Sequence, residues 1–165
     1  MGKVRFYVIA VLAAFFFVPI PEMLYTGDAE ALLVYPFFHA NFFHLAVNCL
    51  SVWVVFDPKT RPEWWYLPIG YIIAVAAYEL TPYVMIGFSC ILFAVAGIRT
   101  PSFRSAWWRS WNAWAYLGTM ALMFFLPMFA ASAHLIAFAM GVAVACYVRF
   151  KRKLAYDTRR AKGGK

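Results

Sequence analysis

Polar side chains capable of nucleophilic chemistry lie inside three long apolar runs of this sequence. Ser89 and His134 stand in two of these runs, and His44 and Asn48 share a third. Polar groups inside an apolar helix are costly, so each of them needs a structural or chemical reason. A serine hydroxyl becomes a nucleophile when a histidine within about 2.6–3.2 Å takes its proton. Ser89 and His134 would form such a pair if the fold brought their two runs together.

Each of these residues also has an ordinary structural explanation. A lone serine in a membrane helix usually bonds the carbonyl one turn earlier, and a His-x-x-x-Asn pair is equally a contact between helices. The three histidines, His39, His44 and His134, are enough in number to bind zinc. However, His39 precedes His44 by five residues and should point elsewhere on a regular helix, and the sequence has no HExxH pattern. We therefore expect neither a metal nor another cofactor.

The composition is that of a membrane protein. Of the 165 residues, 65% are hydrophobic and only 13% are charged, whereas soluble domains carry about 25% charged residues. One soluble core of this size cannot hide so much apolar surface. The net charge of +8 would suggest nucleic acid in a soluble protein, but here the basic residues flank apolar runs, which topology and anionic lipid explain. We expect the lipid bilayer as a partner, and no nucleic acid.

Six apolar runs approach the length of about 20 residues that crosses a bilayer. They cover residues 4–20, 37–56, 64–80, 83–98, 113–129 and 131–150. The sequence therefore predicts an all-α, polytopic membrane protein with six transmembrane helices in residues 1–150. A basic cytoplasmic tail, expected to be disordered, follows in residues 151–165. The spans carry neither the charges nor the broken repeats that are typical of a transporter or channel.

The distribution of basic residues orients the six predicted spans. With the N-terminus on the inner side, all 15 Lys and Arg residues fall on inner segments, while the outer segments carry only acidic charges. The positive-inside rule then predicts an N-in, C-in topology. We expect a multi-pass integral membrane protein, with a bacterial inner membrane as the default location.

The predicted topology places the reactive groups at one depth. His44, Ser89 and His134 lie about seven, six and three residues into spans that run from outside to inside, or within ~5–10 Å of the outer surface. Small residues recur at helical spacing beside Ser89 and His134, which lets two membrane helices approach closely. These small residues are Cys90, Ala94 and Gly97 in the fourth span and Ala137 and Gly141 in the sixth.

Three ordered motifs resemble the rhomboid family of intramembrane serine proteases. The second span reads HANFFHLAVN, where the family carries H-x-x-x-N after an earlier histidine. The fourth span reads GFSC in place of G-x-S-G, and the sixth reads AHLIAFAMG in place of AH-x-x-G-x-x-x-G. The matching positions are His39, His44, Asn48, Gly87, Ser89, His134 and Gly141. The resemblance covers residues 37–147 and implies a rhomboid-like helical bundle.

The resemblance also implies roles for these residues. Ser89 would attack the scissile carbonyl with His134 as general base, in a dyad that has no third acid. His44, the Asn48 side chain and the backbone N–H of Ser89 would stabilise the oxyanion, and Phe93 would pack on the His134 ring. His39, Gly87 and Gly141 would support the site. The implied function is a serine endopeptidase that cleaves single-span membrane proteins near the outer leaflet.

Three departures from the family pattern affect these expectations. Cys90 and Ala137 replace glycines, so we expect the fourth and sixth spans to approach less closely. The first outer loop, residues 21–36, is short. A catalytically inactive rhomboid-like protein that binds transmembrane helices is the alternative function, although the intact Ser–His pair favours activity.

Overall fold

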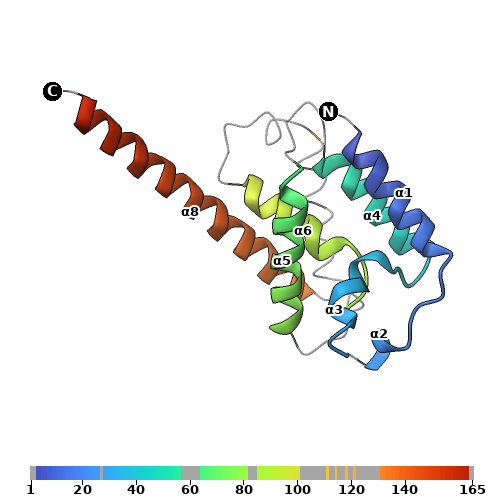
Figure 1. The fold of residues 1–165 in the computed structure, drawn as a ribbon. Helices are drawn as coiled ribbons and strands as arrows, with labels where there is room; N and C mark the ends of the chain where they lie inside the picture. Colours follow the sequence, from blue (N-terminus) through green and yellow to red (C-terminus); the bar gives the residue numbers. More distant parts are fainter. Residues whose placement is uncertain are drawn as a thin grey trace.

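The computed structural model describes residues 3–163 with several gaps. The residues outside the description are 1–2, 27, 57–63, 82–84, 101–110, 112–113, 115–117, 119–120, 122–130 and 164–165. The described chain is all-α, with seven α-helices and one 3-10 helix, η1 (Figure 1). The bounds are α1 Val4–Phe16, α2 Met23–Thr26, α3 Ala31–Val34, η1 Tyr35–Phe37, α4 Phe42–Val55, α5 Tyr66–Glu79, α6 Ser89–Arg99 and α8 Ala131–Gly163.

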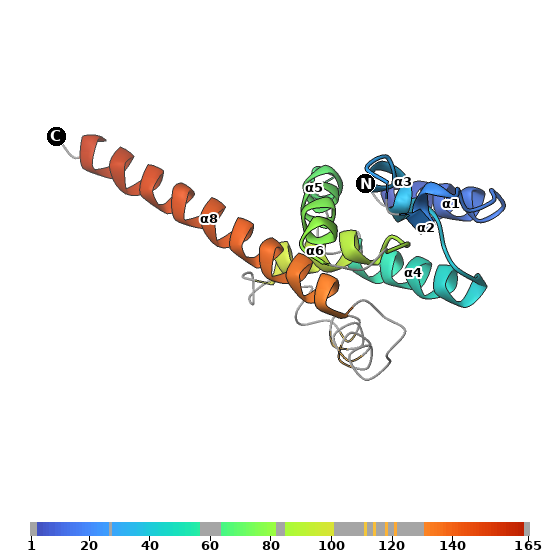
Figure 2. The same ribbon diagram turned by 90° about the horizontal axis from the view of Figure 1, so that it is seen from below.

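Helix α6 lies at the centre of the bundle. Every residue from Cys90 to Arg99 is buried, and α6 packs against α4, α5 and α8. Figure 2 shows α1 and α5 on one side of α6, and α4 with the first turns of α8 on the other. Small residues allow this surrounded position: a Cβ at Gly70 of α5 would lie 2.9 Å from Cγ2 of Val95. A larger residue there would push α5 away from α6.

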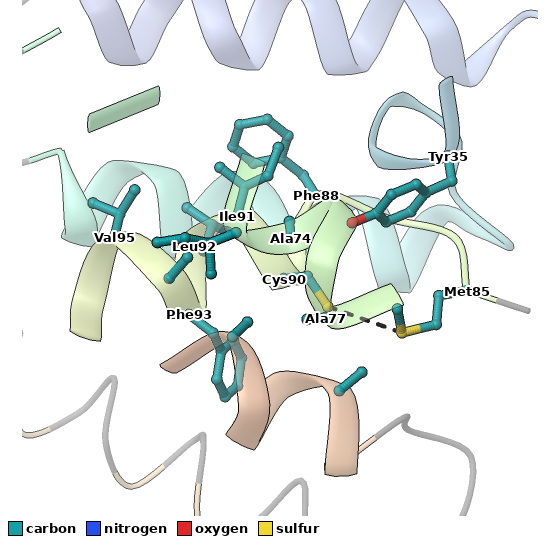
Figure 3. Packing of buried hydrophobic residues seen from close by; sticks show 14 of the residues in the cluster. Tyr35, Ala74, Ala77, Met85, Phe88, Cys90, Ile91, Leu92, Phe93 and Val95 are labelled. Atoms are coloured by element: carbon teal, nitrogen blue, oxygen red, sulfur yellow. Dashed lines mark hydrogen bonds between the residues drawn. The ribbon is translucent and has the colours of Figure 1, made fainter. Parts of the chain in front are cut away.

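The apolar side chains of α6 divide between its two sides. Figure 3 shows Phe93 pointing toward α8, whereas Phe88 and Ile91 point to the opposite side of the helix. Cys90 points in a third direction, toward Met85, and the two sulfur atoms are 4.0 Å apart. This central helix therefore contacts neighbours all around, as a helix that is apolar on every face should.

The helices fit a membrane protein, but fewer of them span a bilayer by length than the six apolar runs suggest. Within the described residues, α8 alone is long and apolar enough, and residues 31–55 would add a second span if the helices on either side of their 83° bend are counted together. Helices α1, α5 and α6 are apolar but shorter. The fifth predicted span, residues 113–129, lies mostly outside the described residues. The three residues of this span that are described, Trp114, Gly118 and Ala121, are helical.

Two predicted spans begin earlier than the corresponding helices. The run 83–98 was expected to be helical throughout, but α6 starts only at Ser89 and residues 85–88 are not helical. The run 37–56 likewise contains a break, because α4 starts at Phe42 after an extended segment. The error has one cause: apolar composition marks burial in lipid or protein, and it does not separate a helix from the turn that leads into it.

The basic tail also differs from expectation. Residues 151–165 were expected to be disordered, but α8 continues without a break to Gly163, and it projects away from the bundle (Figure 1). Lys, Arg, Leu and Ala are strong helix formers, and the stretch contains neither Pro nor Gly before Gly163. The division of the chain at residue 150 stays a prediction, since this helix crosses it.

Candidate active site

Ser89 is the first residue of α6, and a turn centred on Gly87 leads into it. Gly87 has φ +113°, a conformation that side chains other than hydrogen rarely adopt. Its N–H donates to the carbonyl of Tyr35 at 2.9 Å, which ties the turn to η1. Because Ser89 lies in the first turn of α6, its backbone N–H has no carbonyl acceptor within the helix. The turn therefore presents both the Ser89 hydroxyl and a backbone N–H donor at the N-terminal end of α6.

This position removes the ordinary structural explanation for the serine. A serine inside a helix bonds the carbonyl four residues earlier, but Ser89 begins α6 and the described residues 85–88 before it are not helical. The hydroxyl instead pairs with His134 of α8: Oγ of Ser89 lies 2.7 Å from Nε2 of His134. The prediction that the two residues lie within hydrogen-bond reach is thus confirmed. Ser89 begins its helix and does not lie six residues inside it, and the depth of the pair in the bilayer stays a prediction.

His134 is held by packing, and no acid among the described residues bonds its ring. The residue is 6% exposed, and Phe93 stacks on its ring with ring centroids 4.4 Å apart and planes 18° apart. Nδ1 of His134 is buried and has no hydrogen-bond partner in the described part of the chain. In the tautomer that carries its proton on Nδ1, Nε2 accepts the hydrogen bond from the serine hydroxyl. The pair therefore has the geometry of nucleophile and base, with an aromatic ring in place of an orienting carboxylate.

His44 and Asn48 lie on α4 and face the turn before Ser89. The start of α4 is set by Asn41, whose Oδ1 accepts a hydrogen bond from the backbone N–H of His44 at 2.9 Å, as an N-cap should. One helical turn later, Nδ2 of Asn48 donates to the carbonyl of His44 at 3.0 Å. A Cβ at Gly87 would lie 2.6 Å from Nε2 of His44 and 3.5 Å from Nδ2 of Asn48. Both side chains thus converge on the backbone two residues before the serine.

His39 lies closer to His44 than a regular helix would allow. Their ring centroids are 5.1 Å apart in an edge-on contact, so the expectation that the two point apart was wrong. The reason is that His39 precedes α4, in the extended segment before Asn41, and the chain turns its ring back onto the helix. Among the described residues, no group of three His, Cys, Asp or Glu side chains is placed to hold a metal ion.

Glycines bring α6 and α8 together below the Ser–His pair. A Cβ at Gly97 would meet the carbonyl of Phe138, and a Cβ at Gly141 would meet the carbonyl of Ala94. The two helices therefore touch backbone to backbone at these positions. The looser approach expected from Cys90 and Ala137 is not found, since both side chains are almost fully buried and the Ser–His distance is short. The two remaining glycines are sufficient to close the contact.

Two residues that hold the site were missed in the sequence. Tyr35 is fully buried, and it fixes the turn through its backbone carbonyl, which no side-chain pattern reveals. Asn41 had a readable signal, because asparagine directly before an apolar helical run is a typical N-cap. Reading it would have placed the start of α4 correctly and moved His39 out of the helix.

The described fold is an apolar, all-α bundle in which a half-buried serine and a buried histidine pair across two helices. Comparison with family models is more specific: the model of the Rhomboid domain matches residues 22–151. The match covers well over half of the chain, and the protein belongs to the rhomboid family. No curated protein and no solved structure matched the chain significantly.

Proposed function

We propose that this rhomboid-family protein is an intramembrane serine endopeptidase, with Ser89 as nucleophile and His134 as general base. The observation that carries the proposal is the 2.7 Å contact between Oγ of Ser89 and Nε2 of His134. The two residues are 45 positions apart in sequence and lie on different helices. Hydroxyl and imidazole at this distance are ready for proton transfer. The family includes serine proteases, and the pair is intact in this member.

The first chemical step forms an ester on the serine. Oγ of Ser89 attacks the carbonyl carbon of the scissile peptide bond while Nε2 of His134 takes the hydroxyl proton. The resulting tetrahedral oxyanion accepts hydrogen bonds from the Ser89 N–H, from the second amide hydrogen of Asn48 and from His44. His134 then passes its proton to the leaving amine as the C–N bond breaks. Each oxyanion donor typically contributes about 3–4 kcal/mol of transition-state stabilisation.

The second step needs water at the same site. His134, neutral again, takes a proton from a water molecule that attacks the ester carbonyl of acylated Ser89. The oxyanion forms once more and collapses, releasing the second product and returning the proton to Ser89. His39, beside His44, would contribute a polar wall to the route by which water reaches the pair.

The membrane arrangement proposed for this activity has six spans with both termini inside. The directions of the described helices support this topology. Figure 1 shows the N-terminus of α1 and the C-terminal end of α4 near one another, with α2 and α3 at the opposite side of the bundle. Under this topology Ser89 opens toward the outer leaflet. Single-span membrane proteins would be the substrates, entering laterally from lipid between the second and fifth spans.

A serine-reactive fluorophosphonate probe tests the proposal directly. The full-length chain in lipid vesicles should be labelled at Ser89, and labelling should be lost in Ser89→Ala and reduced at least 100-fold in His134→Ala. Ser132→Ala is the matched control, because Ser132 lies two residues before His134 with an exposed side chain, and it should label like the wild type. A folded wild type that stays unlabelled would favour the inactive, helix-binding alternative.

Cleavage of a substrate distinguishes the two functions further. A panel of single-span proteins with small or helix-breaking residues near the outer end of the span should yield two fragments with the wild type and none with Ser89→Ala. Capture of an intact span by both forms, without fragments from either, would contradict the protease proposal.

A further inference from the structure

A second concave site lies on the side of α6 that faces away from α8. This groove has a volume of about 560 Å³ and lies between α1 and α5, with α6 as its floor and η1 at one end. Its size is within the roughly 300–1,000 Å³ range of small-molecule sites. Figure 2 shows α1 and α5 on the same side of α6 but apart from each other. The groove exists because α1 packs mainly against α4 and η1.

The lining of the groove is chemically uniform. Aliphatic, proline and aromatic side chains form it, including Val8, Val11 and Leu12 of α1, Ile72 of α5, Ile91 of α6, and Phe88, which directly precedes α6. The two hydroxyl-bearing residues of the lining are Tyr7 and Tyr71. The Tyr71 hydroxyl is already engaged, since it donates to the carbonyls of Leu32 and Leu33 at 3.2 and 3.1 Å. The groove therefore offers an occupant apolar contacts and almost no hydrogen bonds.

The groove is continuous with the lipid-facing surfaces of α1 and α5. Tyr7 is 66% exposed, Val11 43% and Ile72 66%, so the walls reach the outer surface of the bundle. In a membrane protein such a surface meets acyl chains. Lys3 lies one helical turn before Tyr7, whose N–H bonds its carbonyl at 3.1 Å, and it is exposed. Lys3 does not line the groove, but it stands one helical turn beyond the lining residue Tyr7, where a basic side chain would complement the phosphate of an anionic headgroup.

We propose that this groove binds one acyl chain of an anionic phospholipid, with the headgroup at Lys3. The bound chain would rest on Phe88, which directly precedes Ser89, and on Ile91 in the first turn of α6. Filling the groove then supports the turn that presents the serine from the side opposite His134. The proposal is independent of whether the chain is a protease, since the groove and the Ser–His pair lie on different sides of α6.

Lipid retention in native mass spectrometry tests the site. The full-length chain is reconstituted in vesicles with equal amounts of phosphatidylglycerol and phosphatidylcholine carrying the same acyl chains, and is then transferred to detergent. The wild type should retain one lipid, with phosphatidylglycerol favoured at least fivefold. Val11→Trp, which fills the groove from α1, and Ile72→Trp, which fills it from α5, should each lower retention at least fivefold. Lys3→Gln should retain lipid but lose the headgroup preference.

Matched variants make the outcome decisive. Ala10→Trp adds the same side chain at an exposed residue of α1 that does not line the groove and should retain lipid like the wild type, and so should Ser89→Ala. Equal retention by the wild type and both groove-filling variants would overturn the proposal. Equal retention of the two lipids by the wild type would overturn the headgroup assignment. A diazirine-bearing phosphatidylglycerol should crosslink to peptides of α1 and α5, and lipid crosslinks confined to other helices would overturn the proposed site.

Discussion

The imidazole of His44 lies directly against the α-carbon of Gly87. A Cβ at Gly87 would approach both Cε1 and Nε2 of that ring to 2.6 Å, closer than real Cβ contacts, and the residue has φ +113°. The turn before Ser89 and the two α4 residues proposed as oxyanion donors, His44 and Asn48, therefore pack closely because residue 87 has no side chain. Moving either group would change the distance between the α4 donors and the serine.

Replacing Gly87 should separate these two groups without unfolding the bundle. In Gly87→Ala the new methyl group must displace the His44 ring and strain the turn, so we expect kcat to fall roughly 100-fold, as when one oxyanion donor is lost. Cleavage kinetics or the rate of fluorophosphonate labelling measures this. Gly118→Ala is the control, because a Cβ there meets no described atom within 4 Å. Equal rates for the two variants would refute the proposed coupling.

Removing the Asn48 amide should act on the transition state. Asn48 is 2% exposed and uses one amide hydrogen within α4, which leaves the other for the oxyanion. Asn48→Ala should lower kcat by roughly 10²–10³-fold with little change in KM. Ser51→Ala, one turn further along the same helix, should keep both parameters near the wild type. A rise in KM alone would show that Asn48 binds substrate and does not stabilise the oxyanion.

For the activity of His134, the aromatic ring of Phe93 should matter more than whether that ring carries a hydroxyl group. Phe93→Leu removes the aromatic face that lies 4.4 Å from the imidazole, so His134 should sample more orientations and kcat should drop roughly tenfold. Phe93→Tyr preserves the stacked ring and should stay within about twofold of the wild type. The labelling rate, with thermal unfolding as a check on folding, compares them. Similar losses in both variants would mean that volume, and not stacking, holds the histidine.

The backbone contact of α6 with α8 should tolerate no side chain at Gly141. In Gly141→Val the new atoms would meet the Ala94 carbonyl, which forces the helices apart and costs about 1–3 kcal/mol as overpacking. We expect a lower unfolding temperature and loss of labelling together, because the same two helices carry Ser89 and His134. Ala143→Val, on an exposed part of α8, should change neither. Labelling at the wild-type rate in folded Gly141→Val would contradict this account.

Parts of this site were predictable because they depend on side-chain type and spacing. Ser89 and His134 stand in separate apolar runs with small residues beside them, and helical periodicity alone puts those residues at a helix contact. The start of α6 was not predictable in the same way, since Phe88 and Ser89 belong to one apolar run and the break depends on the backbone of Gly87. Contacts through main-chain atoms, such as the Tyr35 carbonyl, leave no pattern in the side chains.

A buried arginine at the C-terminal end of α6 should stabilise the fold without serving the reaction. Arg99 is 6% exposed, and its Nη1 donates to the carbonyl of Val55, the last residue of α4. A cation there satisfies a helix-end carbonyl and complements the negative end of the α4 dipole. Arg99→Met should lower the free energy of unfolding by about 1–3 kcal/mol, while the folded variant labels at the wild-type rate well below its unfolding temperature. Arg152→Met, on the exposed end of α8, should leave stability unchanged, so equal unfolding of the two variants in a denaturant titration would count against a role for Arg99 in joining α4 to α6.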